Sequence, residues 1–177
     1  MNEDIAQELK EVIRSIPDFP QKGILFRDIT TLIKDRDAFK SAIDAIYDHY
    51  KNERIDKVVS TEARGYIFGG AIAYILGSGV VPVRKPGKLP APTIKEEYEL
   101  EYGTDALEIH KDAIRTGERV LVFDDLLATG GTALATCKLV ERLGGKVIGV
   151  AFLIELTDLK GKEKLKDYEI FSLIKYD

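Results

Sequence analysis

The chain has 177 residues, of which 45% are hydrophobic and 32% are charged, and its formal net charge is −4. These values are typical of one globular domain, and they argue against disorder and against a general nucleic-acid-binding surface, which would be basic. No apolar run is long enough for a membrane helix, and the acidic N-terminus does not resemble a signal peptide. We therefore expect a cytoplasmic protein that binds neither membranes nor nucleic acid.

Hydrophobic periodicity predicts helices and strands that alternate along the chain. Apolar residues at helical spacing predict a first helix that starts near Ile5 and ends at Pro17, followed by an irregular segment through Thr31. Further helices are expected at 38–50, 65–76 and 132–143, and strands at 57–60, 80–83, 107–109, 120–123, 146–155 and 168–173. This alternation favours a single α/β domain over 1–177, with a mostly parallel sheet and helices on both faces.

The segment from Val120 to Ala133, VLVFDDLLATGGTA, carries the clearest chemical signal. Four apolar residues lead into the acid pair Asp124 and Asp125, and a small-residue turn then precedes a helix. Unpaired N–H groups at a helix N-terminus favour a bound phosphate, whereas two carboxylates suit hydroxyl groups such as those of a ribose. Ligands of α/β sheets bind at the carboxyl ends of the strands, where this pair is expected. The segment therefore predicts recognition of a ribose 5-phosphate rather than a plain strand-to-helix turn.

Three other segments carry weaker signals. Arg64 follows a predicted strand, where it is placed either to meet a phosphate or to form a surface salt bridge with Glu62. Residues 84–105 combine cations, glycine and prolines, which favours a mobile lid loop with a short hairpin near Tyr98 over a solvated connection. Phe26 is placed either to stack on a flat heterocycle or to pack in the core.

Six motifs in chain order resemble those of the adenine phosphoribosyltransferases, within the type I phosphoribosyltransferases: DFPQKGILFRDIT, EARGYIFG, RKPGKLP, YELEYG, VLVFDDLLATGGTA and ELTDLKG. The similarity covers nearly the whole chain. It implies the type I phosphoribosyltransferase fold, with a small N-terminal base-binding hood within 1–34 and a lid loop at 84–105. It also implies transfer of the phosphoribosyl group of 5-phosphoribosyl-1-pyrophosphate (PRPP) to adenine, which yields AMP and pyrophosphate in purine salvage.

The resemblance implies a role for individual residues of these motifs. The expected PRPP-binding residues are Arg64, Arg84, Lys85, Lys88, Tyr102, Asp124, Asp125, Ala128, Thr129, Gly130, Gly131 and Thr132. The expected adenine-binding residues are Leu25 (through its backbone), Phe26, Arg27 and Leu156. The expected catalytic residues are Glu101, for proton exchange with the purine, and Arg64, for the charge of the departing pyrophosphate.

The resemblance also implies a cofactor and a partner. Mg²⁺ would be held mainly by PRPP and water, with Asp124 or Asp125 as a candidate protein ligand. A homodimer is expected, in which the lid or basic loop of one subunit completes the site of the other. Three alternatives stay open: transfer to another base, a non-enzymatic sensor of PRPP, and a structural protein with a degenerate site. The chain lacks a basic recognition helix, which disfavours a sensor that binds nucleic acid.

Overall fold

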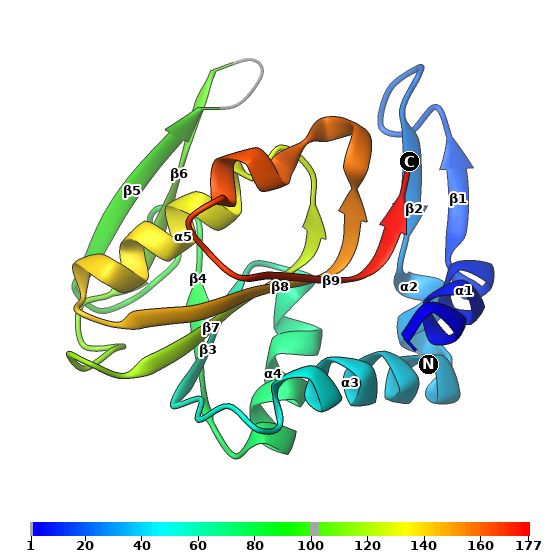
Figure 1. Cartoon of the computed structure of the whole chain (residues 1–177). Helices are drawn as coiled ribbons and strands as arrows, with labels where there is room; N and C mark the ends of the chain where they lie inside the picture. The colour runs from blue at the N-terminus through cyan, green and yellow to red at the C-terminus, as the bar shows by residue number, and fades with distance from the viewer. Residues whose placement is uncertain (1, 100–102) are drawn as a thin grey trace.

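The computed structural model describes residues 2–99 and 103–177. Figure 1 shows how its elements are arranged. In chain order they are α1 (Asn2–Val12), β1 (Arg14–Pro17), β2 (Leu25–Asp28), α2 (Thr30–Lys34), α3 (Arg36–Tyr50), β3 (Lys57–Thr61), α4 (Gly65–Leu76), β4 (Gly79–Val83), β5 (Thr93–Glu99), β6 (Thr104–His110), β7 (Arg119–Leu127), α5 (Gly131–Arg142), β8 (Lys146–Leu156), the short 3-10 helices η1 (Thr157–Leu159) and η2 (Gly161–Leu165), and β9 (Ile170–Tyr176).

Five parallel strands form the central sheet, in the order β4-β3-β7-β8-β9 (Figure 1). The central strand β7 pairs with β3 only as far as Ser60↔Phe123, but with β8 as far as Leu127↔Glu155. It therefore continues past the point where β3 ends. The core strands are rich in Val, Leu and Ile, as expected of parallel strands that are buried on both faces. The predicted α/β fold with a mostly parallel sheet is confirmed.

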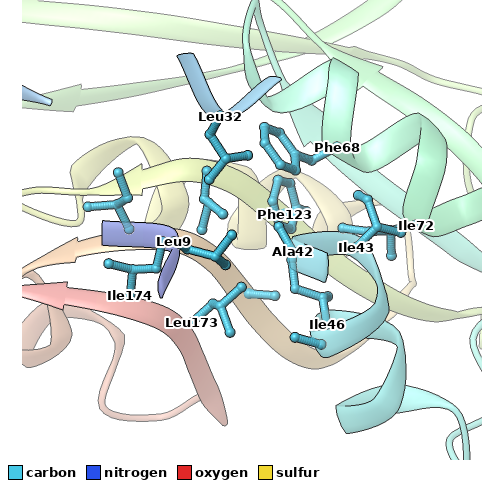
Figure 2. Packing of buried hydrophobic residues seen from close by; sticks show 14 of the residues in the cluster. Leu9, Leu32, Ala42, Ile43, Ile46, Phe68, Ile72, Phe123, Leu173 and Ile174 are labelled. Atoms are coloured by element: carbon cyan, nitrogen blue, oxygen red, sulfur yellow. The ribbon is translucent and has the colours of Figure 1, made fainter. Parts of the chain in front are cut away.

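A hydrophobic core lies on each face of the sheet. On one face, side chains such as Leu9, Ile46 and Phe123 join the first four helices to the sheet (Figure 2). On the other face, α5 packs on residues such as Val122. Alternate residues of β7 face opposite cores because successive side chains of a strand point to opposite sides. Cys137 of α5 packs in the second core as a small apolar side chain, and burial raises the pKa of its thiol to about 12.

Local sequence signals determine where α3 begins and where α4 ends. The Asp35 carboxylate accepts hydrogen bonds from the backbone N–H groups of Asp37 (3.0 Å) and Ala38 (2.9 Å), which caps the N-terminus of α3. Gly77 ends α4 with a φ of +68°, a left-handed conformation that glycine adopts without a steric penalty.

The N-terminal segment corrects the sequence-based expectation of one helix up to Pro17. The first helix ends at Val12, and β1 pairs antiparallel with β2, from Arg14↔Asp28 to Pro17↔Leu25. The end of the expected helix and the segment expected to be irregular therefore supply the two strands of a small sheet, which is followed by α2. Pro17 fits there because it stands at the end of an edge strand, where a missing N–H breaks no ladder. We call α1, β1, β2 and α2 together the hood.

The strand expected at 107–109 is confirmed, but it lies outside the central parallel sheet. It belongs to β6, which pairs antiparallel with β5 from Thr93↔His110 to Glu99↔Thr104 (Figure 1). Part of the lid loop expected at 84–105 is thus a hairpin, longer than the short one predicted. Glu96 of this hairpin forms ion pairs with Lys138 (3.3 Å) and Arg142 (3.0 Å), which attach it to α5. Among the described residues, no helix combines the length and apolarity needed to cross a bilayer.

Asp28 links the strands of the hood to α2. Its Oδ1 accepts hydrogen bonds from the backbone N–H (3.0 Å) and hydroxyl (2.7 Å) of Thr30, and its Oδ2 accepts two from Arg14 (3.1 and 2.5 Å). These hydrogen bonds, those from Thr30 first, lower the pKa of the Asp28 carboxyl to about 2. Because the folded-state pKa lies below the unfolded value of about 4, this carboxylate stabilises the fold above about pH 4, and the contribution is lost as pH falls through 2.

We expect Asp28→Asn to lower the free energy of unfolding at pH 7 by about 1–3 kcal/mol, because two charge-assisted hydrogen-bonding partners are left poorly satisfied. The difference from the wild type should shrink as pH falls from about 4 towards 2. Urea denaturation at a series of pH values measures both quantities. Asp37→Asn, at an exposed carboxylate that pairs with Arg36, is the control. If the difference in unfolding free energy between Asp28→Asn and the wild type stays constant with pH, the lowered pKa of Asp28 is contradicted.

Candidate active site

The acid pair lies where β7 continues beyond its neighbour β3. Asp124 and Asp125 follow Phe123, and they are only 9% and 8% exposed. The backbone N–H of Asp125 donates to Asp124 Oδ1 (3.0 Å). Burial, and after it the neighbouring Asp125 carboxylate, raises the pKa of Asp124 well above its ordinary value. A ligand that donates hydroxyl hydrogen bonds to this pair would offset the cost of burying its charge.

Arg64 connects the acid pair to the hood. It stands immediately before α4, and its Nε lies 2.7 Å from Asp125 Oδ2. Its guanidinium carbon lies 5.5 Å from the centroid of the Phe26 ring in β2. The next residue, Gly65, lets α4 approach closely, since a Cβ there would lie 3.1 Å from Asp124 Oδ1. Three residues predicted from separate motifs, Arg64, Asp125 and Phe26, are thus brought together.

The small-residue loop 128–132 wraps a cavity of about 60 Å³ at the start of α5. Gly130, with a φ of +80°, is the residue before the helix, so the N–H groups of the first turn have no partner within the helix. Their partial positive charge favours an anion. All five residues expected to hold the 5-phosphate line this cavity.

The four residues expected to bind adenine line one cavity of about 100 Å³. Leu25, Phe26 and Arg27 come from β2, and Leu156 comes from the end of β8 on the opposite wall. Arg64 and Asp125 also line it, and Leu126 borders both this cavity and the one at the loop 128–132. The two cavities are therefore neighbours at the end of β7.

The other expected cations lie around Glu62, on the loop between β3 and α4. Arg84 Nε lies 2.9 Å from Glu62 Oε2, and the backbone N–H of Lys85 donates to Glu62 Oε1 (2.6 Å). Burial alone would raise the pKa of Glu62, but these two hydrogen bonds outweigh it and lower the pKa below its ordinary value. The Lys85 ammonium pairs with Asp105 of β6 (2.9 Å), and the Lys88 carbonyl accepts a hydrogen bond from Arg84 (3.0 Å).

Two expected site residues, Glu101 and Tyr102, lie outside the described residues. The described part of the hairpin approaches the loop 128–132, because a Cβ at Gly131 would lie 3.2 Å from the Tyr98 ring. Within residues 2–99 and 103–177, no three His, Cys, Asp or Glu side chains gather in a way that would hold a metal ion. The carboxylate oxygens of the acid pair fit Mg²⁺, which keeps several waters and takes few protein ligands when it binds a phosphorylated substrate.

Comparison with known proteins identifies the family. A model described as the phosphoribosyl transferase domain matches residues 30–177. The adenine phosphoribosyltransferase of Clostridium perfringens is 60% identical over 169 residues, which cover 96% of this chain and 98% of that protein. The chain belongs to the adenine phosphoribosyltransferase family. The resemblance and the type I phosphoribosyltransferase fold expected from the sequence are confirmed.

Solved structures of adenine phosphoribosyltransferases share this fold over almost the whole chain. The Thermoanaerobacter pseudethanolicus enzyme is 57% identical, with a TM-score of 0.94, and the match covers 97% of this chain and 99% of that one. The Saccharomyces cerevisiae enzyme, solved with an imino-altritol bisphosphate and adenine, is 42% identical, with a TM-score of 0.92 and coverage of 97% and 99%. The roles of individual residues stay predictions.

Sequence reasoning missed two residues that shape this site. Glu62 organises the cations Arg84 and Lys85, whereas the sequence suggested it only as a partner of Arg64. Gly161 at the start of η2 supports the loop 128–132: a Cβ there would lie 2.2 Å from the Ala128 carbonyl oxygen. Its motif, ELTDLKG, marks the position, but the contact joins segments far apart in sequence and is visible only in the fold.

We expect Gly161→Ala to lower the free energy of unfolding by about 1–3 kcal/mol, because the added methyl group overlaps the Ala128 carbonyl. Displacement of the loop should also weaken the binding of PRPP, measured by calorimetry, by about tenfold or more, since loop geometry sets the direction of the N–H donors. Glu163→Ala, at an exposed position of the same short helix, is the control and should match the wild type. Unchanged PRPP affinity in Gly161→Ala would show that η2 does not support the phosphate loop.

Proposed function

We propose that this chain forms AMP and pyrophosphate from adenine and PRPP, and that the two neighbouring cavities are its substrate sites. The observation that carries this proposal is their arrangement: an anion-binding helix N-terminus and an apolar slot share Leu126, and Asp125 of the buried acid pair lines the slot. A nucleoside monophosphate likewise combines a phosphate, a ribose with hydroxyl groups and a flat base within one molecule. Membership of the adenine phosphoribosyltransferase family supports the same reaction and the role in purine salvage.

In this proposal, PRPP lies across the end of β7. The N–H groups of residues 128–132 bind the 5-phosphate, and Asp124 and Asp125 accept hydrogen bonds from the ribose hydroxyls. The proposed pyrophosphate ligands are Arg64, Arg84, Lys85, Lys88 and Tyr102. In the structure the first three have carboxylate partners, which a doubly charged phosphate would replace. Mg²⁺, when bound, would neutralise pyrophosphate charge, with Asp124 or Asp125 as the protein carboxylate nearest to it.

Adenine lies in the slot between Phe26 and Leu156, with the backbone at Leu25 and Arg27 reading its edge. Ring nitrogen N9 forms a bond to C1 of PRPP while the bond from C1 to the pyrophosphate oxygen breaks. The transition state resembles an oxocarbenium ion, so the protein mainly orients the reactants and stabilises charge. Glu101 exchanges a proton with the purine, and Arg64 stabilises the departing pyrophosphate. A lid at 84–105 that excludes water would protect the reactive sugar.

We expect the purified protein, given PRPP, Mg²⁺ and a panel of bases, to form AMP with adenine and no nucleotide with hypoxanthine, guanine or xanthine. Chromatography of the products and an assay for released pyrophosphate measure this. Turnover with another base alone would leave the PRPP site in place but reject the assignment of the adenine slot. Binding of PRPP without release of pyrophosphate would instead support a sensor.

Glu101→Gln tests the proton-transfer role in the same assay. Loss of a positioned acid or base should lower kcat by about 100-fold or more while the KM for adenine changes little. Glu97→Gln, at an exposed position of β5, is the matched control. Equal activity of Glu101→Gln and the wild type would remove that role from Glu101.

The proposal includes a homodimer. An exposed apolar face, defined here as Ile67, Tyr74 and Ile75 of α4 with Val80 of β4, lies at the edge of the central sheet. Tyr74 is 88% exposed and Val80 is 51% exposed. Apolar side chains gathered in this way are typical of a protein–protein contact. The cytoplasmic location expected from the sequence stays a prediction.

We expect Tyr74→Glu to convert a dimer to a monomer, because a charged side chain at the most exposed position of this face would have to be buried on association. Sedimentation equilibrium measures the mass of each form. Leu159→Glu, at an exposed apolar position outside this face, is the control and should leave the mass unchanged. A wild type that sediments as a monomer, or a Tyr74→Glu dimer as tight as the wild type, would reject this face as the interface.

A further inference from the structure

Tyr176, the next-to-last residue of the chain, lies under the side chain of Arg27. The Arg27 guanidinium carbon stands over the Tyr176 ring, 3.9 Å from its centroid, and the ammonium of Lys10 in α1 lies 5.3 Å from the same centroid. Arg27 also donates a hydrogen bond from Nη1 to Ser15 Oγ in β1 (2.5 Å). Side chains from three elements of the hood therefore converge on this one ring, directly or through Arg27.

The Tyr176 backbone is itself fixed to the wall of the proposed adenine slot. Strand pairing sets Tyr176 opposite Leu156, which lines the slot. Thr157, the residue after Leu156, brings its hydroxyl to within 3.1 Å of the Tyr176 carbonyl oxygen and 2.8 Å of the Asp177 carboxylate. The Tyr176 hydroxyl is buried without a hydrogen-bond partner among the described residues. The ring face, rather than the hydroxyl, is therefore the part of Tyr176 that makes specific contacts.

We propose that Tyr176 is a positioning residue for adenine: by holding Arg27, it sets the distance between the hood strand β2 and the opposite wall at Leu156. This inference rests on the proposed function of the slot. The hood meets the slot through β2, whose partner strand β1 is short and largely exposed, so the small sheet by itself does not determine how far β2 stands from Leu156. A cation over an aromatic face supplies an attraction of the size needed to select one position.

The contacts also predict which substrate binds more weakly when the Tyr176 ring is removed. The expected phosphate and ribose sites lie on β7 and the loop that follows it, and neither contacts Tyr176 through the interactions described above. Loss of the ring should therefore weaken the binding of adenine and leave the binding of PRPP unchanged. A general loss of folding stability would instead affect both substrates.

Steady-state kinetics with purified variants tests this separation. We expect Tyr176→Leu to raise the KM for adenine about three- to tenfold, the range given by loss of one cation–π contact, with kcat and the KM for PRPP within about twofold of the wild type. Tyr176→Phe keeps the ring face and should behave as the wild type. Arg27→Met removes the cation and should raise the KM for adenine similarly, and the double variant should be no worse than the poorer single variant.

Phe171→Leu is the matched control, because it removes an aromatic ring from the same strand, at a place where that ring stacks on His49 rather than on the hood. It should lower the melting temperature without raising the KM for adenine. If Tyr176→Leu does not fold, Arg27→Met carries the test with the ring still present.

Three results would overturn the inference: an unchanged KM for adenine in both Tyr176→Leu and Arg27→Met, a parallel rise in both KM values, or a Tyr176→Phe variant as impaired as Tyr176→Leu. Calorimetry provides a readout that does not need turnover, since AMP should bind more weakly to Tyr176→Leu while pyrophosphate binds as to the wild type. A wild type that forms no AMP from adenine would reject the proposed function itself, and is thereby distinguished from failure of this inference.

Discussion

The site depends on the different lengths over which β7 pairs with its two neighbours. Pairing with β3 ends at Phe123, whereas pairing with β8 continues to Leu127. One edge of β7 is therefore free of strand partners at Asp124 and Asp125, so that Arg64 and α4 approach the pair from the side where β3 has ended. The continued pairing with β8 holds this end of β7 rigidly, and rigid support is what a binding loop requires in order to keep its N–H groups aligned.

Three cations around the site have carboxylate partners within the protein. Arg64 pairs with Asp125, Arg84 with Glu62, and Lys85 with Asp105. Partly exposed ion pairs of this kind contribute little to stability, about 0–1 kcal/mol each. Their value is that the long cationic side chains are already ordered near the place where phosphates would bind. A multiply charged ligand can replace the carboxylates at low cost, because it offers more charge to the same guanidinium and ammonium groups.

The central sheet could be predicted from the sequence because each strand is a short, continuous apolar run between helix signals, and the acid pair followed such a run directly. The hood could not, because β1 and β2 are four-residue strands with mostly exposed or half-buried side chains and no clear alternation. The predicted strand at 107–109 pairs with β5. This partner could not be predicted, because the sequence of β5, TIKEEYE, is mostly polar. Within the site, the motifs predicted that Arg27 binds adenine, and Arg27 lines the same cavity as the other three residues of that prediction. The position of its guanidinium over Tyr176 could not be predicted, because the two residues are far apart in the sequence and no local pattern encodes their contact.

The last segment of the chain packs against both proposed substrate sites, although none of the expected catalytic residues lies in it. Gly161 packs against the carbonyl of Ala128 and so supports the loop that would bind the phosphate. Tyr176 holds Arg27 of the hood and pairs with Leu156 on the other wall of the adenine slot. Both supports belong to the same continuous piece of chain that follows β8. In the proposed site, the position of the loop 128–132 relative to the base slot would therefore depend on packing behind it. Substitutions there would change how well the two substrates are aligned without removing any group that touches them.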